Sequence, residues 1–325
     1  MSQSNSLNRR GFFKAGLAGL ALAGSSQITT AAHAAAPKKG PAGGQFHRFN
    51  LGGFEVTTLR DGSFSVDTVQ GIFGQDQQLS AVETLAHENH LPKNRMTIGF
   101  APVLVNTGSE LVLFDTGNAP GRRPGAGHLV HALEASGISA GDVDVVVITH
   151  MHGDHIGGML KDGKAAFPNA RYVTGQVEYD FWTHPDRFAG ETESRAQLVK
   201  DNVARFADRM TFLNGGGAVA SGIEAVEAFG HTPGHMAFHI ESNGQRLMLC
   251  GDAANHPVFS LQRPDWHVKF DMDKAAAAAT RKKLFGMVAA DRIGFTGYHM
   301  PFPAVGFVDT KDQGFRYVPA SYQFS

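Results

Sequence analysis

The chain has 325 residues and a formal net charge of −1, so its overall charge gives no reason to expect nucleic acid or an anionic membrane as a partner. Hydrophobic residues make up 42% of the sequence, enough for a sizeable core, and its 39 glycines suit a structure with many tight turns. The single cysteine, Cys250, excludes an internal disulfide and a zinc site built from several thiolates.

Residues 1–36 have the features of an export signal. The pair Arg9-Arg10 precedes two aromatic residues and a lysine, and the mildly apolar run over 15–24 is too short to span a bilayer. Small residues typical of cleavage sites follow at 32–36. This pattern resembles a twin-arginine signal, with an ordinary secretory signal as the alternative. We therefore expect a periplasmic or secreted protein without a stable membrane anchor.

The rest of the chain is predicted to form one domain over residues 46–325. It is preceded by a flexible lead-in over 37–45, which is rich in Pro, Gly and Lys. In the first half, the expected elements are strands over 54–59, 102–105, 110–114 and 143–148, a loop with a short helix over 70–95, and a helix over 127–136. The run over 143–148 is continuously apolar, which predicts a strand buried on both faces.

The second half repeats this alternation. We expect strands over 171–173, 223–226, 236–241, 245–250 and 292–296, and helices over 176–182, 194–209 and 273–289. Asn243-Gly244 is typical of a hairpin turn. Because strands outnumber helices and occur in both hairpin and βαβ contexts, the order predicts two mixed sheets packed together with helices outside.

A run of six residues shortly after the strand at 143–148 is rich in metal-ligand side chains. It reads His150-Met151-His152-Gly153-Asp154-His155. His150 and His152 are two residues apart, so both imidazoles point the same way in an extended segment. Imidazole and carboxylate suit zinc, with Mn, Fe or Co as alternatives. A His-rich surface loop is the other interpretation, but the buried strand before the run and Gly157-Gly158 after it favour a rigid chelating edge.

Four segments together resemble the metallo-β-lactamase superfamily. The run 149–155 has the HxHxDH signature, His231-Thr232-Pro233-Gly234-His235 resembles a turn whose last His is a ligand, and Gly251-Asp252 and His299 resemble the later ligand sites. The resemblance implies an α+β fold, an αββα sandwich with two metal ions at one edge. It implies that one ion is bound by His150, His152 and His235, that the other is bound by Asp154, His155 and His299, and that Asp252 bridges them.

The resemblance further implies two Zn²⁺ ions per chain and a hydroxide between them that attacks the substrate. Zinc lowers the pKa of bound water to about 7, and a second metal can polarise the attacked carbonyl or phosphoryl oxygen, so no Ser or Cys nucleophile is needed. Asp115 follows the strand at 110–114 and matches the superfamily's earlier acidic motif. It would orient a ligand or its loop, with a plain turn cap as the alternative.

A closer resemblance is to the methyl parathion hydrolase group. It rests on stretches at 53–62, 104–109, 166–170, 180–182, 281–283 and 314–319. That group includes exported, dimeric dizinc enzymes acting on phosphotriesters, aryl esters and lactones, so the resemblance implies a homodimer and a small-molecule substrate. Trp182 matches a pocket aromatic of the group, with a buried core Trp as the alternative. Phe181 and Phe302 are candidates for the same pocket or for a dimer surface.

The chain also departs from that group near the expected site. Gly153 stands where Pro is usual, and Arg122 and Arg123 stand where an aromatic wall is expected. Asn255 and His256 follow Asp252 closely enough to reach the site. A neutral triester gains little from guanidinium groups, whereas a lactone or an anionic ester gains more; this argument fails if the arginines face solvent.

These residues predict a hydrolase of esters or lactones with phosphotriester hydrolysis as a side activity. The alternatives are a dedicated methyl parathion-type phosphotriesterase, a thioesterase, and a metal-binding protein without catalysis such as a periplasmic zinc buffer. A buffer has no need of a bridging carboxylate, and the sequence therefore favours an enzyme.

Overall fold

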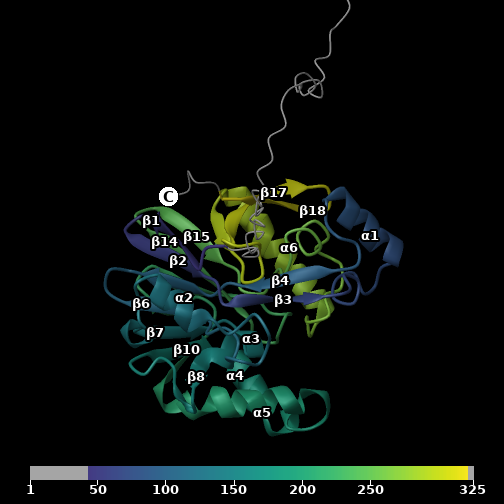
Figure 1. Cartoon of the computed structure of the whole chain (residues 1–325). Coiled ribbons are helices and arrows are strands. Elements are labelled where there is room, and N and C mark those ends of the chain that lie inside the picture. The colour runs from purple at the N-terminus through teal and green to yellow at the C-terminus, as the bar shows by residue number, and fades with distance from the viewer. Residues whose placement is uncertain (1–42, 321–325) are drawn as a thin grey trace, which may run out of the picture. The chain divides into compact units, whose positions relative to one another are not determined.

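The computed structural model describes residues 43–320. These residues form one compact unit. The predicted signal peptide lies outside the described residues, and of the predicted lead-in only residues 43–45 are included. Two seven-stranded sheets form the two central layers, one built from strands within residues 46–213 and the other from strands within residues 218–319 (Figure 1). The expected fold of two mixed sheets with flanking helices is confirmed.

The first sheet combines antiparallel and parallel pairing. Its strands up to β6 pair antiparallel, and β6, β7, β10 and β11 run parallel to one another. In spatial order it contains β1 (Phe46–Leu51), β2 (Phe54–Leu59), β5 (Val103–Asn106), β6 (Leu111–Phe114), β7 (Val145–Ile148), β10 (Arg171–Gly175) and β11 (Met210–Leu213).

The second sheet is mainly antiparallel, with one parallel pair between β15 and β16. In spatial order it contains β12 (Ala218–Ala220), β13 (Ile223–Glu227), β14 (Met236–Ser242), β15 (Gln245–Leu249), β16 (Gly294–Thr296), β17 (Val305–Lys311) and β18 (Gly314–Pro319). β16 begins two residues later than predicted, because Arg292 adopts a left-handed conformation (φ 53°) that ends the preceding helix.

The core between the sheets explains the apolar run that becomes β7. Val145 and Val147 face the second sheet and pack with residues such as Phe238 and Leu249, whereas Val146 and Ile148 face the helices. All four β7 side chains are fully buried, as predicted for a strand covered on both sides.

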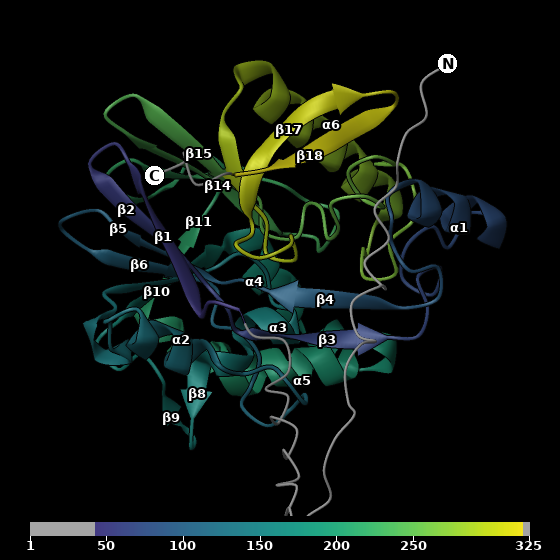
Figure 2. The same cartoon turned by 45° about the horizontal axis from the view of Figure 1, so that its top comes forward.

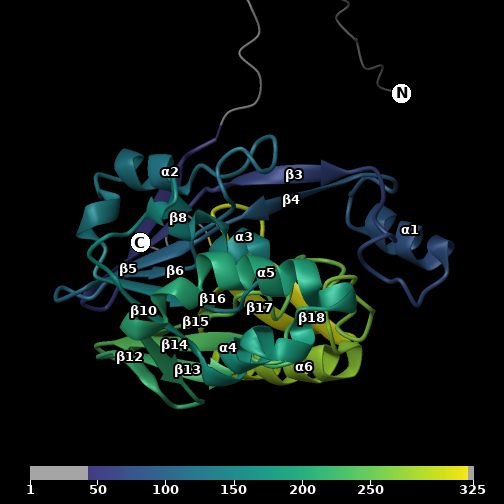
Figure 3. The same cartoon turned by 90° about the horizontal axis from the view of Figure 1, so that it is seen from below.

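Helices cover the outer faces. The α-helices are α1 (Leu79–Glu88), α2 (Leu129–Ala135), α3 (Gly153–Ile156), α4 (Gln176–Thr183), α5 (Glu193–Asn202) and α6 (Lys274–Asp291). α2, α4 and α5 contribute to the cluster on the outer face of the first sheet, with α4 and α5 side by side (Figure 3). α6 packs on the outer face of the second sheet. None of the helices within residues 43–320 combines the length and hydrophobicity needed to cross a membrane.

The predicted helix over 194–209 is divided. α5 ends at Asn202, and a 3₁₀ segment, η5 (Ala204–Arg209), follows it. At the junction Val203 has φ −106°, and both Val203 and Phe206 are buried in the cluster beneath. The other 3₁₀ segments are η1 (Ala140–Asp142), η2 (Gly157–Met159), η3 (Pro185–Arg187) and η4 (Gly190–Thr192).

Two small two-stranded sheets complete the unit. One pairs β8 (Leu160–Lys161) with β9 (Lys164–Ala165), and the other pairs β3 (Gly62–Val66) with β4 (Met96–Phe100). α1 lies beyond the far end of the β3–β4 ribbon (Figure 2). The ribbon matters for function because residues on it form one side of the cavity described below.

Candidate metal centre

The His-rich run lies at the carboxyl end of β7, in the central part of the first sheet. Its neighbours are other strand ends: Asp115 follows β6, His231 lies between β13 and β14, Asp252 follows β15 and His299 follows β16. Residues from both sheets therefore meet at one edge of the sandwich, although they are separated by more than 180 positions along the chain.

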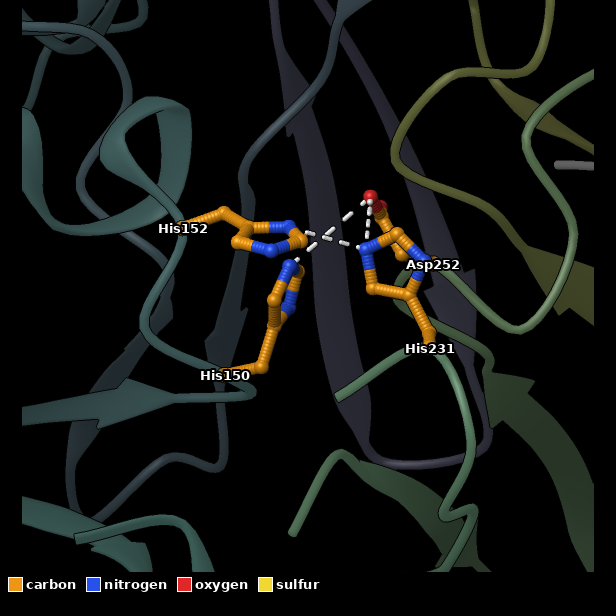
Figure 4. A group of neighbouring side chains, drawn as sticks. All are labelled: His150, His152, His231 and Asp252. Atoms are coloured by element: carbon orange, nitrogen blue, oxygen red, sulfur yellow. Dashed lines mark hydrogen bonds and ion pairs between the residues drawn. The ribbon is translucent and has the colours of Figure 1, made fainter. Parts of the chain in front are cut away.

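The first group of ligand-type side chains contains His150, His152, His231 and Asp252, all buried. The three imidazoles and the carboxylate of Asp252 point toward one another, with one possible ligand atom of each within 4.8 Å of the others (Figure 4). Oδ2 of Asp252 lies 3.2 Å from Nε2 of His231 and 3.8 Å from Nε2 of His150. Nδ1 of His152 lies 3.0 Å from Nε2 of His231.

A second group adjoins the first and contains Asp154, His155 and His299. Oδ2 of Asp154 lies 3.7 Å from Nε2 of His299 and 4.0 Å from Nε2 of His155. Asp252 reaches this group as well, because its Oδ1 lies 3.4 Å from His155 Nε2 and its Oδ2 lies 3.1 Å from His299 Nε2. Asp252 is therefore shared between the two groups, and together they form a dimetal site.

His231 occupies the place that the sequence analysis gave to His235. The ring of His235 is buried, its Nδ1 lies 3.0 Å from the carbonyl oxygen of Ala228, and its Nε2 accepts a hydrogen bond of 2.9 Å from the backbone N–H of Asp252. Both ring nitrogens are thus engaged by backbone. The expectation that His235 belongs to the first group is wrong for this geometry, and His235 instead supports the loop that carries Asp252.

The buried polar atoms of the site fit a bound cation. Nε2 of His150, His152 and His155 and Oδ1 of Asp252 are buried without a hydrogen-bond partner within residues 43–320. Buried polar atoms normally have partners, and the side chains of each group bring one possible ligand atom apiece within 4.8 Å of one another, so both groups suit a metal ion. The mixture of imidazole and carboxylate suits zinc or another first-row metal.

The protonation equilibria of the site agree with this fit. Burial and the neighbouring imidazoles hold the pKa of His150 and of His152 well below the ordinary value, so both rings are neutral. Burial also acts to lower the pKa of His231, but the carboxylates of Asp252 and Asp271 outweigh it and raise that pKa to about 9. Because a metal ion binds the neutral form of imidazole, its binding would displace the additional proton of His231.

In three of the ligand-type histidines, the second ring nitrogen is held by a fixed acceptor. His155 Nδ1 lies 2.8 Å from Oδ2 of Asp115, and His299 Nδ1 lies 2.8 Å from the carbonyl oxygen of Gly99. His231 Nδ1 lies 2.8 Å from Oδ1 of Asp271. Such acceptors fix the tautomer and the orientation of each ring.

Asp115 lies where its predicted role requires it. Besides its contact with His155, its carboxylate accepts hydrogen bonds from the backbone N–H and the hydroxyl of Thr149, at the start of the His-rich run. Asp115 has φ 63°, a conformation that is rare for residues other than glycine and that concentrates at functional sites. Its carboxylate therefore orients both a ligand and the loop that bears the ligands.

Glu178 connects the two loops that supply the first group. Its buried carboxylate accepts hydrogen bonds from the backbone N–H groups of Met151 and Gly234, from the hydroxyl of Thr232 and from Nε1 of Trp182. Trp182 is fully buried in the core beneath the first sheet. The prediction that Trp182 lines the pocket is therefore wrong, and its buried-core alternative is correct.

A cavity of about 270 Å³ opens beside the metal groups. Its apolar wall comes from the β3–β4 ribbon, α5 and the 253–273 loop, through Phe64, Ile98, Leu198 and Phe270. Its polar lining includes Arg122, Arg123, Arg195 and Asn255 beside the metal groups. Arg122 lines the cavity and is also exposed to solvent, and the half-buried Arg123 lines it too, with its guanidinium 4.7 Å from the ring centre of Phe64.

Three other pocket predictions are not met. Phe181 is half-buried against the helical core and contacts Arg187. His256 is directed to a separate cavity of about 560 Å³ beside the β3–β4 ribbon, and its Nδ1 accepts hydrogen bonds from Val258 and Phe259. Phe302 does not line the metal-site cavity. His256 and Phe302 lie on loops and Phe181 on α4, and the sequence pattern does not specify which way these side chains point.

Several residues of the site were not singled out by the sequence analysis. They are Arg195, Glu178, Asp271 and Tyr298, whose ring lies 3.9 Å from that of His155 and whose hydroxyl donates to the carbonyl oxygen of Asp154 at 2.5 Å. Of these residues, only Glu178 is marked by a local pattern. It lies four residues before Trp182 on one helix, so the two side chains share a face.

Comparisons with known proteins agree with this geometry. Residues 102–294, more than half of the chain, match the family model described as the metallo-beta-lactamase superfamily. N-acyl homoserine lactonase AttM of Agrobacterium fabrum is 32% identical over 132 residues, which are 38% of this chain and 46% of that protein. The chain thus spans about half the length of the curated relatives it matches.

Two solved structures are similar over most of the unit. One is described as AidC, a dizinc quorum-quenching lactonase: it has a TM-score of 0.78 and 27% identity, and the match covers 85% of this chain and 98% of that one. The other is described as the hydrolase AbOPH in the beta lactamase superfamily: it has a TM-score of 0.80 and 25% identity, and the match covers 87% of this chain and 99% of that one.

Proposed function

Because the chain belongs to the metallo-beta-lactamase superfamily, we propose that it is a dizinc hydrolase acting on lactones and esters. The observation that carries the proposal is the position of Asp252, whose carboxylate faces both groups of unsatisfied imidazole nitrogens. When bound, two metal ions in such a site supply a hydroxide near neutral pH and polarise the attacked carbonyl.

The residues of the chain prepare the site for this chemistry. His150, His152 and His231 would hold one ion, Asp154, His155 and His299 the other, and Asp252 both. Asp115, Asp271 and the Gly99 carbonyl fix the rings. The apolar wall of the cavity would accept the acyl part of a substrate and exclude water from it.

A cysteine nucleophile is not part of the proposal. Cys250 is fully buried, and burial raises the pKa of its thiol, so a reactive thiolate is disfavoured. The lactonase relatives and the dizinc lactonase structure support a lactone substrate. Phosphotriester hydrolysis as a side activity is proposed from the sequence resemblance alone, as are the homodimer and export by a twin-arginine signal.

A substrate screen on the purified, metal-analysed protein tests the proposal. We expect two zinc ions per chain, and hydrolysis of γ-lactones and p-nitrophenyl esters that exceeds hydrolysis of methyl parathion and is lost after chelation. High turnover of methyl parathion without lactone cleavage would reverse the order of substrates. Two bound metals without hydrolysis of any ester, thioester, lactone or phosphotriester would instead favour a metal buffer.

A further inference from the structure

Two arginines that line the metal-site cavity, Arg122 and Arg195, are exposed to solvent and form no ion pair within residues 43–320. The guanidinium groups of Arg122 and Arg195 line the cavity, and neither makes a hydrogen bond or ion pair with any residue of the described part of the chain. The carboxylates of the cavity, Asp154 and Asp252, belong to the metal groups.

The guanidinium of Arg122 lies over Gly153 in the His-rich run, in space that a side chain at this position would fill. A Cβ atom at this position would lie 2.1 Å from Nη1 of Arg122 and 3.1 Å from a methyl group of Leu198. The glycine therefore makes room for the guanidinium. The two departures noted in the sequence, Gly153 in place of Pro and Arg122 in place of an aromatic wall, form one arrangement in the structure.

Asn255 supplies an independent indication of a ligand. It is only 3% exposed and lines the same cavity three residues after Asp252. Neither Nδ2 nor Oδ1 of its amide has a hydrogen-bond partner within residues 43–320. A buried amide without partners costs free energy, so its place beside the metal site suits a polar group that arrives with the substrate.

Resting on the hydrolase function proposed above, we propose that this cavity selects substrates that carry a carboxylate in addition to the scissile ester or lactone. The N–H groups of Arg122 and Arg195 donate to the carboxylate oxygens, and the amide of Asn255 hydrogen-bonds to a neutral polar group of the same substrate. Guanidinium groups suit carboxylates because their planar N–H donors match the two oxygens.

Matched substrates test this selection. Mono-p-nitrophenyl adipate carries a free carboxylate, and its methyl ester does not. We expect a higher kcat/KM for the anion, and a fall in the anion-to-neutral ratio by about five- to tenfold in Arg122→Gln and in Arg195→Gln. Arg205→Gln is the matched control, because Arg205 is exposed and lies outside the cavity lining; it should leave the ratio unchanged.

A binding measurement makes the test independent of turnover. Adipic acid mono-anilide and its methyl ester are amide analogues, and their dissociation constants for the metal-loaded protein can be measured by calorimetry. We expect the acid to bind more tightly, and Arg122→Gln, Arg195→Gln and Asn255→Ala each to weaken it. A carboxylate that simply coordinates the metals would bind these variants as tightly as the wild type, which would overturn the proposal.

Different experimental results would refute the hydrolase function and the carboxylate subsite. If the protein hydrolyses neutral esters but shows no preference for the anion and no effect of the arginine substitutions, the carboxylate subsite is wrong and the hydrolase function stands. If no ester is hydrolysed but the acid anilide binds through the arginines, the hydrolase function fails and the subsite stands. If the substitutions change only inhibition by adipate, the arginines hold the product, and substrate selection is wrong.

Discussion

Nδ1 of His231 lies 2.8 Å from Oδ1 of Asp271, and Oδ2 of the same carboxylate lies 2.8 Å from Nη2 of Arg281. All three side chains are buried. Burial alone would raise the pKa of Asp271, but His231 and Arg281 outweigh it and lower that pKa below its ordinary value. An ionised Asp271 accepts from the N–H on Nδ1 of the imidazole, so that Nε2 is the nitrogen that faces the metal site.

We therefore expect Asp271→Asn to weaken metal binding by about 10- to 100-fold. Competition with a chromophoric chelator measures the affinity, and circular dichroism checks that the variant is folded. Asp265→Asn is the control, because Asp265 is an exposed carboxylate paired with Lys282, and we expect it to have no effect. Metal affinity of Asp271→Asn within twofold of the wild type would show that Asp271 does not act through His231.

The two histidines of the 231–235 turn should behave differently. We expect His231→Ala to retain fewer than two metal ions per chain after dialysis. His235→Ala should retain two and lose about 2–4 kcal/mol of unfolding free energy, because it removes a buried ring and two hydrogen bonds to backbone. Metal analysis and urea unfolding of both variants check this. The opposite pattern of metal retention would restore His235 as the ligand.

His231 and His235 also show how much of the metal site can be predicted from the sequence. Ligand-type residues at the ends of apolar strands predict a metal edge, because strand ends of one sheet edge meet in space. The choice between His231 and His235 depends on which ring the turn directs inward, and the deciding partner, Asp271, lies 40 residues away. No local pattern marks that contact.

The same dependence on distant tertiary contacts explains why the predictions for the pocket residues are wrong. Strands such as β7 were predicted because their burial follows directly from apolar runs. Trp182 and His256 were misplaced because their directions depend on tertiary partners: Trp182 on the buried carboxylate of Glu178, and His256 on the turn at Val258 and Phe259. The ribbon strands β3 and β4 are absent from the prediction although both alternate polar and apolar residues, because each is only five residues long and contains a glycine.

Glu178→Gln should destabilise the protein although it changes only one atom. The wild-type carboxylate accepts four hydrogen bonds, two on each oxygen. A Gln amide would place an NH₂ group against two donors, leaving buried groups unpaired. We expect a loss of about 3 kcal/mol in the free energy of unfolding, measured by urea denaturation of metal-loaded protein.

The control for this substitution is Glu88→Gln at the exposed end of α1, which should stay within about 0.5 kcal/mol of the wild type. A stability of Glu178→Gln equal to that of the control would mean that Glu178 does not hold the two ligand loops together.

His256 should make the stability of the protein depend on pH. Burial lowers the pKa of His256 to about 3, below the value of about 6.5 expected for an unfolded chain. Between these values the unfolded state binds the additional proton, so stability is lost as the pH falls below about 6.5, with a slope of at most about 1.4 kcal/mol per pH unit.

The variant His256→Asn isolates this contribution. An Asn side chain can accept from the backbone of Val258 and Phe259 as the imidazole does, but it does not titrate. We expect the wild type to lose more stability than His256→Asn between pH 7 and pH 5, measured by urea unfolding of metal-loaded protein. Parallel stability curves for the two proteins would refute the assignment.

Gly153→Ala should reproduce the effect of removing Arg122. The added Cβ would meet the flexible end of Arg122, so the guanidinium moves while the backbone, which has no positive φ at this residue, stays in place. We expect two metal ions per chain as in the wild type, and an anion-to-neutral ratio of kcat/KM reduced about as much as in Arg122→Gln.

The double variant Gly153→Ala/Arg122→Gln distinguishes this mechanism from an independent effect on the metal loop. If Gly153 acts by making room for Arg122, the double variant should show no further loss of the ratio, because residues that act through one contact are not additive. Gly286→Ala is the control, since a Cβ there meets nothing within 4 Å and should leave the ratio unchanged. Additive losses in the double variant would show that Gly153 affects the metal site directly, and the link between the two departures from the family pattern would be lost.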